Sequence, residues 1–240
     1  MTNNIPTDVL RDLAPNGILR AGINIGNPAL AQRDVAGAEI RGIAVDLARE
    51  LGRELDVDVE FVTFDAAGKL FDAVKANAWD VAFMAIDLER GIDVLFTPPY
   101  LAIEGTYVVR ADSPALSVDD LDRAGVRVAI GAGGAYDLFL SRTLKHAKLV
   151  RRPSAAEAFK LFLEERLDAA AGVRQVLTQF AQRHDGLRVI DDHFMVIEQA
   201  IATPKPRTAG SAFLSSFIED LKSCGFVAAA LKRTREFAAA

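Results

Sequence analysis

A short glycine-rich segment, Gly131-Ala-Gly-Gly134, stands directly before a helical pattern that begins near Tyr136. A loop of this kind presents backbone N–H groups at the positive end of a helix, so it can bind an anion. It does not match a nucleotide-binding loop. A dinucleotide fingerprint needs a third glycine where Tyr136 stands, and the Gly-Lys-Ser/Thr of a P-loop is absent. The alternative interpretation is a plain strand-to-helix turn.

Covalent and metal chemistry have little support in the sequence. The single cysteine, Cys224, cannot form an internal disulfide, and the three histidines, His146, His184 and His193, lack the spacing of a zinc site. The hydrolase and metalloprotease motifs Gly-x-Ser-x-Gly and His-Glu-x-x-His are also absent. We therefore expect no metal, no cofactor and no enzymatic activity.

Charge and hydropathy argue against a nucleic-acid-binding protein and a membrane-spanning one. The 240 residues include 28 Lys and Arg against 33 Asp and Glu, a net charge of -5, which does not favour a nucleic-acid partner. Apolar runs fall far short of the roughly 20 residues that a membrane span needs. The polar N-terminus, Met1 to Gly17, does not resemble a secretory signal, so the sequence as it stands predicts a cytoplasmic protein, or a periplasmic one if a signal was removed.

The elements that must position these residues form two α/β series. The first combines strands expected near 19–25, 57–61 and 81–86 with helices near 43–55 and 70–74, an order that implies parallel strands flanked by helices. After a strand at 106–110 and the turn Asp112-Ser113-Pro114, the pattern restarts. The second series has strands at 126–130, 148–151, 167–173 and 187–190, with helices from 136, 154 and 176. A strand at 195–203, a helix over 213–221 that ends at Gly225, and a helical tail follow.

The segment from Ala78 to Tyr100 is similar to a segment of the family 3 solute-binding proteins, the amino-acid-binding components of ABC transporters. Its resemblance lies in Asp80, Arg90 and the ending Phe96-Thr-Pro-Pro-Tyr100. Four other stretches resemble family motifs in the same order: Leu19 to Gly22, Gly42 to Ala48, Asp119 to Leu121 with Val126 to Gly131, and Leu167 to Ala171. The resemblance spans about Ile18 to Leu231.

This resemblance implies an α/β, two-lobed type II periplasmic-binding-protein fold with two hinge crossovers. We expect lobe 1 to comprise residues 1–106 and 200–240, and lobe 2 residues 107–199. The two crossovers are expected near Thr106 to Arg110 and Ile197 to Ala202.

The resemblance also implies site residues. Arg90 stands where the family places the arginine that grips the ligand's carboxylate; the alternative is a solvated arginine paired with Glu89 or Asp93. The loop at Gly133, Gly134, Ala135 and Tyr136 would supply backbone donors, although Gly134 replaces the family's threonine.

Other family positions differ in this sequence. Asn27 replaces the stacking aromatic, Phe83 and Ala85 stand where serine or threonine is usual, and Val173 replaces the aspartate that binds the ligand ammonium. Candidates to compensate are Arg174, Gln175, Glu104 and Glu198, each of which has an ordinary surface role as its alternative. The cleft should therefore favour an anion over a zwitterionic amino acid.

These observations predict a solute-binding protein that closes on a small carboxylate-bearing metabolite, amino-acid-like or an organic acid, for transport or sensing. Arg90 of lobe 1 and the Gly131 to Tyr136 loop of lobe 2 would meet across the cleft. The partners expected are that small molecule and an ABC permease or signalling protein, and the chain itself is expected to be monomeric. Two alternatives stay open: a cyclohexadienyl-dehydratase-like enzyme on the same fold, acting through Glu104 or Glu198, and a cytoplasmic sensor.

Overall fold

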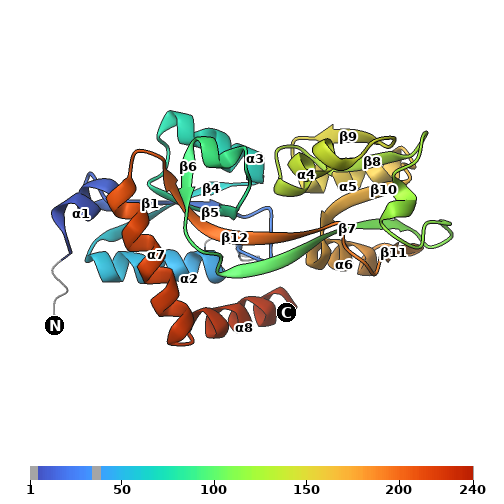
Figure 1. Ribbon diagram of the computed structural model, residues 1–240. Helices are drawn as coiled ribbons and strands as arrows, with labels where there is room; N and C mark the ends of the chain where they lie inside the picture. The colour runs from blue at the N-terminus through green and yellow to red at the C-terminus, as the bar shows by residue number, and fades with distance from the viewer. Residues whose placement is uncertain (1–4, 34–38, 240) are drawn as a thin grey trace. The chain divides into compact units, whose positions relative to one another are not determined.

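The computed structural model describes residues 5–33 and 39–239, which divide into two compact units (Figure 1). Unit 1 comprises the chain up to Leu101 and from Glu198 onward, and unit 2 comprises Ala102–Ile197. The chain enters unit 2 along strand β7 (Leu101–Arg110) and returns along strand β12 (Met195–Pro204). The lobe limits expected from the sequence, near residues 106 and 200, lie in these same two strands.

Unit 1 is built on a sheet with the strand order β4-β1-β5-β12. Strand β1 (Ile18–Asn24) is parallel to both β4 (Asp58–Phe64) and β5 (Val81–Ala85), as the alternation of strands and helices predicted. Strand β12 runs antiparallel to β5 and to the short strand β6 (Val94–Phe96). The carboxyl ends of β1 and β5 therefore share one edge of the sheet.

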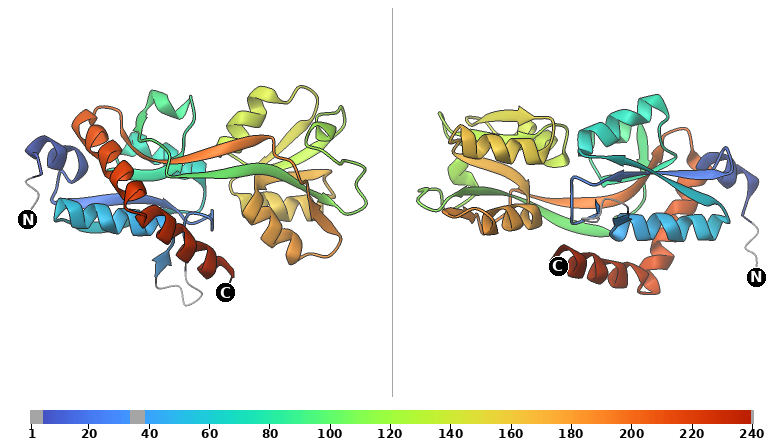
Figure 2. Two further views of the ribbon diagram at one scale, coloured as in Figure 1. Left: turned by 60° about the horizontal axis from the view of Figure 1, so that its bottom comes forward. Right: turned by 180° about the vertical axis from the view of Figure 1, so that it is seen from behind.

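Helices cover both faces of this sheet. Helix α2 (Ile43–Leu55) buries its apolar face on one side, where α7 (Thr208–Ser223) and α8 (Phe226–Ala239) complete the core (Figure 2). Helix α3 (Ala67–Asp72), extended by the 3-10 turn η1 (Ala73–Ala76), covers the other side with a smaller core. The elements that the sequence did not predict include α1 (Thr7–Leu13), packed on α7, and strands β2 (Gln32–Arg33) and β3 (Ile40–Arg41), which pair with each other.

The strands of unit 2 follow the order β7-β10-β8-β9, with β11 (Leu187–Val189) beside β7. Strands β8 (Arg127–Gly131), β9 (Lys148–Arg152) and β10 (Ala169–Val173) are parallel, whereas β7 is antiparallel to β10. Helix α4 (Ala135–Thr143) packs into one core, and α5 (Ala155–Glu164) and α6 (Arg174–Gln182) pack into another. A 3-10 turn, η3 (Asp119–Leu121), precedes β8.

The ends of two predicted helices, the one from 154 and the one that ends at Gly225, are visible in atomic detail. The Ser154 hydroxyl accepts the backbone N–H of Glu157 at 3.2 Å, which caps the start of α5, and it donates to the Glu157 carboxylate at 3.0 Å. Gly225, with φ of 80°, follows α7 in the left-handed conformation that favours glycine. Throughout residues 5–33 and 39–239, every helix is too short or too polar to traverse a lipid bilayer.

Candidate functional site

In unit 1, the residues singled out in the sequence gather at the carboxyl edge of the sheet. Asn27 follows the end of β1, and Ala85 is the last residue of β5, a few residues before Arg90. The register of β12 brings Gln199 opposite Ala85, with Glu198 next to it. The carboxyl edge of parallel strands is where α/β proteins bind ligands, so this edge is the candidate site of unit 1.

Arg90 begins the 3-10 turn η2 (Arg90–Ile92), which follows β5. Its side chain is only 1% exposed, so it is not a solvated surface arginine. Its Nη1 donates to the carbonyl of Ala85 at 3.1 Å, and its guanidinium lies 5.7 Å from the ring centre of Phe71. Both contacts hold the planar guanidinium in one orientation, which suits two-point recognition of a carboxylate.

The loop after β1 is fixed by its own side chains. The Asn24 side-chain oxygen accepts the N–H of Gly26 at 2.9 Å, and that of Asn27 accepts the N–H of Ala29 at 3.2 Å. A Cβ on Gly26 would lie 2.1 Å from the carbonyl oxygen of Asp65, so only glycine fits there. Asn27 thus shapes this loop through its side-chain oxygen. Asn24, which the sequence analysis missed, does the same at the start of the loop.

In unit 2, the glycine loop and the end of β10 share one edge because β8 and β10 are parallel. Gly134 precedes α4, Ala135 and Tyr136 begin it, and the Tyr136 ring would contact a Cβ on Gly134 at 3.1 Å. Strand β7 runs back along β10, with Gly105 opposite Val173, so Glu104 reaches the same edge. The structure therefore brings together all of the unit 2 residues that the sequence predicted: Glu104, Gly133, Gly134, Ala135, Tyr136, Arg174 and Gln175.

A carboxylate from the chain itself occupies part of the glycine loop. Asp137, only 4% exposed, accepts the N–H of Gly133 at 2.9 Å and pairs with the Nε of Arg151 at 3.0 Å. It also lies 3.4 Å from the hydroxyl of Ser141. The Gly133 N–H, expected to serve a ligand, therefore already has an anionic acceptor. An acid three residues after Gly134 is a helix-capping signal that could have been noticed in the sequence.

Arg174 and Glu104 form an ion pair at this edge. The Arg174 guanidinium also donates to the backbone carbonyls of Ile190 at 3.0 Å, Asp191 at 2.8 Å and Asp192 at 2.9 Å. The other carboxylate oxygen of Glu104 lies 3.6 Å from Nδ1 of His193. Arg174 thus ties β7, the end of β10 and the 190–192 segment together, and most of its donors are already used.

The remaining predicted residues have simpler surroundings. Gln175 lies exposed in the first turn of α6, and Glu198 is exposed on β12, where its backbone carbonyl accepts the N–H of Ile86 at 2.8 Å. Val173 is buried at the end of β10 and supplies no charge. Asp168, before β10, accepts the N–H of Arg127 at 2.7 Å and so caps the opposite edge of the sheet.

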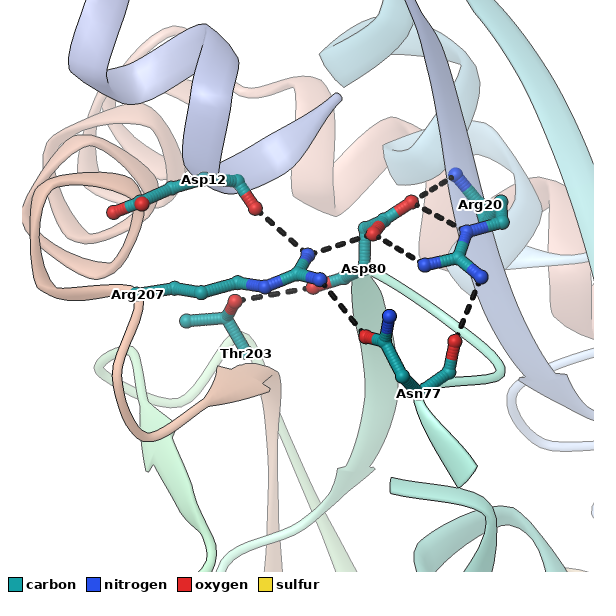
Figure 3. Close-up of polar contacts among 6 residues, drawn as sticks. All are labelled: Asp12, Arg20, Asn77, Asp80, Thr203 and Arg207. Atoms are coloured by element: carbon teal, nitrogen blue, oxygen red, sulfur yellow. Dashed lines mark hydrogen bonds and ion pairs between the residues drawn. The ribbon is translucent and has the colours of Figure 1, made fainter. Parts of the chain in front are cut away.

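The opposite edge of the unit 1 sheet holds a buried ion-pair network (Figure 3). Asp80 has no exposed surface and binds Arg20 at 2.8 Å and Arg207 at 2.7 Å. The guanidinium groups also donate to Asn77 and to the carbonyl of Asp12. Burial by itself would raise the pKa of Asp80, but the hydrogen bonds from the two arginines hold it below its ordinary value of 3.8. This network joins α1, β1, β5 and α7, so its role is structural.

A surface groove of about 340 Å³ in unit 1 lies apart from the residues predicted above. Arg41 and Arg49 both pair with Glu39 at 3.2 Å, and Arg233 of α8 pairs with Asp46 of α2 at 2.8 Å. Each arginine that lines this groove thus pairs with one of the groove's two acids, and the Arg233–Asp46 pair joins α8 to the start of α2.

The comparisons with known proteins identify a family and a fold. The sequence model of the bacterial extracellular solute-binding proteins, family 3, matches residues 19–233. A solved structure of a variant of ArgBP from T. maritima superposes with a TM-score of 0.82 at 26% identity, covering 95% of this chain and 99% of that one. The fold is that of the type II periplasmic binding proteins, as the resemblance implied.

Two curated relatives match over part of the sequence. The arginine-binding periplasmic protein of Mannheimia haemolytica is 25% identical over 158 residues, which cover 64% of this chain and 62% of the relative. The cyclohexadienyl dehydratase of Pseudomonas aeruginosa is 24% identical over 157 residues, which cover 64% of this chain and 58% of the relative. This chain therefore spans less than two thirds of the length of the curated relatives it matches.

Proposed function

The chain belongs to family 3 of the bacterial extracellular solute-binding proteins, and from this premise we propose that it recognises its solute through a carboxylate group. The observation that carries the proposal is Arg90, a buried guanidinium held at the carboxyl edge of unit 1 by Ala85 and Phe71. A carboxylate matches its planar fork of donors.

We further propose that the solute carries no positive charge on the carbon next to its carboxylate. Val173 is apolar where an aspartate would receive an α-ammonium, and the Glu104 carboxylate is already paired with Arg174. An unpaired ammonium would therefore lose its hydration without gaining a partner. The glycine loop offers fewer backbone N–H donors to a solute than the sequence suggested, because Asp137 already accepts the Gly133 N–H.

The test is calorimetric titration with two matched series that differ only at the α-position. One series is L-aspartate, L-malate and succinate; the other is L-arginine, its 2-hydroxy analogue and 5-guanidinopentanoate. We expect the compounds without an α-ammonium to bind more tightly than the matching amino acid. Arg90→Ala should weaken every carboxylate by about 100-fold, since two charge-assisted hydrogen bonds contribute about 3 kcal/mol.

The matched control is Arg53→Ala, which removes an exposed arginine of the same unit and should leave binding unchanged. Tight binding of an amino acid that survives in Arg90→Ala would contradict both the anion preference and the role of Arg90.

A second candidate function is a dehydratase-like enzyme, favoured by the similarity to the cyclohexadienyl dehydratase. Such a reaction needs a carboxyl group free to move a proton, and Glu104 is engaged by Arg174 and faces His193. Glu198 is exposed and offers a second carboxylate. Recovery of the bound solute after incubation separates the two functions, because a binder returns it unchanged and an enzyme consumes it.

The family membership also supports a partner and a place of action. Its description as extracellular supports action outside the cytoplasmic membrane, in the periplasm of a cell that has one. An ABC permease that receives the solute from the binding protein is the partner that this membership supports.

A further inference from the structure

Gln199 carries a buried hydrogen-bond acceptor that the fold leaves unmatched. The residue lies on β12 opposite Ala85 and is only 3% exposed. Its side-chain Oε1 accepts no hydrogen bond from any residue that the structure describes. Buried polar atoms are nearly always hydrogen-bonded in folded proteins, because burying an unmatched one costs free energy. An exception of this kind needs a reason.

Buried hydroxyl groups near the other end of β12, unlike Gln199, have hydrogen-bond partners. The Thr203 hydroxyl, also buried, donates to the carbonyl of Asp80 at 3.0 Å. Close by, the Thr97 hydroxyl donates to Pro98 and accepts the N–H of Ile201. The buried hydroxyls beside the later residues of β12 are thus matched, whereas the side-chain oxygen of Gln199, at the carboxyl edge of β5, is not.

Tyr100 adds a second unmatched group beside Gln199. The Tyr100 N–H donates to the carbonyl of Gln199 at 2.9 Å, and its ring packs edge-on against Phe83. Its buried hydroxyl has no hydrogen-bond partner among the described residues. Burial raises the pKa of Tyr100 above its ordinary value of 10.0, so the hydroxyl stays a neutral donor. Two residues joined by a backbone hydrogen bond therefore carry one unmatched acceptor and one unmatched donor.

We propose that Gln199 contacts the solute and accepts a hydrogen bond from a hydroxyl group beside the solute's carboxylate. The proposal rests on the proposed function and narrows its substrate class to hydroxy acids. Gln199 is suited to this role because it lies across from Ala85, whose carbonyl orients Arg90. A hydroxyl can donate to the neutral Gln199 oxygen, whereas an ammonium would bring a charge that a neutral amide oxygen does not balance.

The experiment compares Gln199→Met with the wild type in titrations with L-malate and succinate. Methionine keeps the length of the side chain and removes the acceptor. The wild type should bind L-malate about tenfold more tightly than succinate. In Gln199→Met, L-malate should fall to the affinity of succinate, and succinate itself should bind as before. The same loss of preference is expected between the 2-hydroxy analogue of arginine and 5-guanidinopentanoate.

Thermal unfolding separates a binding role from a structural one. Because Gln199 is unmatched in the fold, Gln199→Met should unfold at the wild-type temperature or above it. The control, Thr203→Val, removes a matched buried hydroxyl from the same strand and should unfold at a lower temperature while keeping the preference for L-malate.

Three results would overturn the inference. One is equal binding of L-malate and succinate by the wild type, and another is an undiminished preference in Gln199→Met. The third is a lower unfolding temperature of Gln199→Met together with unchanged binding. If the wild type binds no compound of either series, the proposed function fails as well, so the two failures are distinguishable.

Discussion

Asp80 is a carboxylate without exposed surface that faces two arginines. Arg20 and Arg207 come from opposite ends of the chain, so this one acid connects β1 with the start of α7 (Figure 3). If Asp80 were neutralised, the two arginines would lose the negative charge that they share. Asp80 therefore contributes to stability through its charge as well as through its hydrogen bonds.

Replacing Asp80 by asparagine should destabilise the protein by about 3 kcal/mol, because it leaves two arginines without their buried partner. The loss should also depend on pH. Since the pKa of Asp80 is lowered in the folded state, its contribution is present above about pH 4 and is lost as the pH falls further. Urea unfolding at pH 7 and pH 3 measures both effects, and the difference between wild type and Asp80→Asn should shrink at pH 3.

The matched control is Asp65→Asn, which breaks the exposed ion pair with Lys69. An exposed pair contributes less than about 1 kcal/mol, so this variant should resemble the wild type at both pH values. Equal effects of the two substitutions would show that burial of Asp80 is not what makes it important.

At the scale of elements, each loop at the carboxyl edges is shaped by groups of its own chain. Asn24 and Asn27 hold the loop after β1, and Asp137 holds the glycine loop before α4. Such loops keep their shape before a solute binds, which reduces the conformational entropy lost on binding. Ser154 fixes the start of α5 in the same way at the end of β9.

Ser154→Ala should destabilise unit 2 by about 1 kcal/mol, because the N–H of Glu157 loses its acceptor at the first turn of α5. Urea denaturation followed by circular dichroism measures the change. The control, Ser215→Ala, places the same substitution inside α7, where the Ser215 hydroxyl only donates to the carbonyl of Ser211. Alanine favours a helix interior, so the control should be neutral or slightly more stable. A larger loss in the control would contradict the capping argument.

At the scale of the whole molecule, each unit has cores of its own. The two core clusters of unit 2 draw their buried residues from within Ala102–Ile197, and the clusters of unit 1 draw theirs from the two flanking segments. Unit 2 is continuous in sequence, whereas unit 1 needs both ends of the chain. A continuous segment with its own core can fold by itself.

A polypeptide of residues 102–197 should therefore fold alone and unfold in one cooperative thermal transition. Differential scanning calorimetry measures this directly. The comparison is a polypeptide of residues 1–101, which lacks β12, α7 and α8 and should show no cooperative transition. A cooperative transition in residues 1–101 together with none in 102–197 would contradict the division of the cores.

The sequence by itself determined the longer elements and the family. The spacing of Ile43, Leu47, Leu51 and Leu55 predicted α2 because helix periodicity is a local property of the chain. Motifs such as the segment from Ala78 to Tyr100 identified the family, which the match over residues 19–233 confirms. The loops that contain Arg90 and Gly134 could also be predicted, because each follows a strand whose apolar pattern is visible in the sequence.

Only the tertiary structure decided which polar groups are already engaged. Arg174 pairs with Glu104, 70 residues earlier in the chain, because β7 and β10 are neighbours. Gln199 could not be singled out from the sequence, because its position opposite Ala85 follows from the register of β12 against β5. Strand register is fixed by the packing of residues far apart in the sequence, so no local pattern reports it.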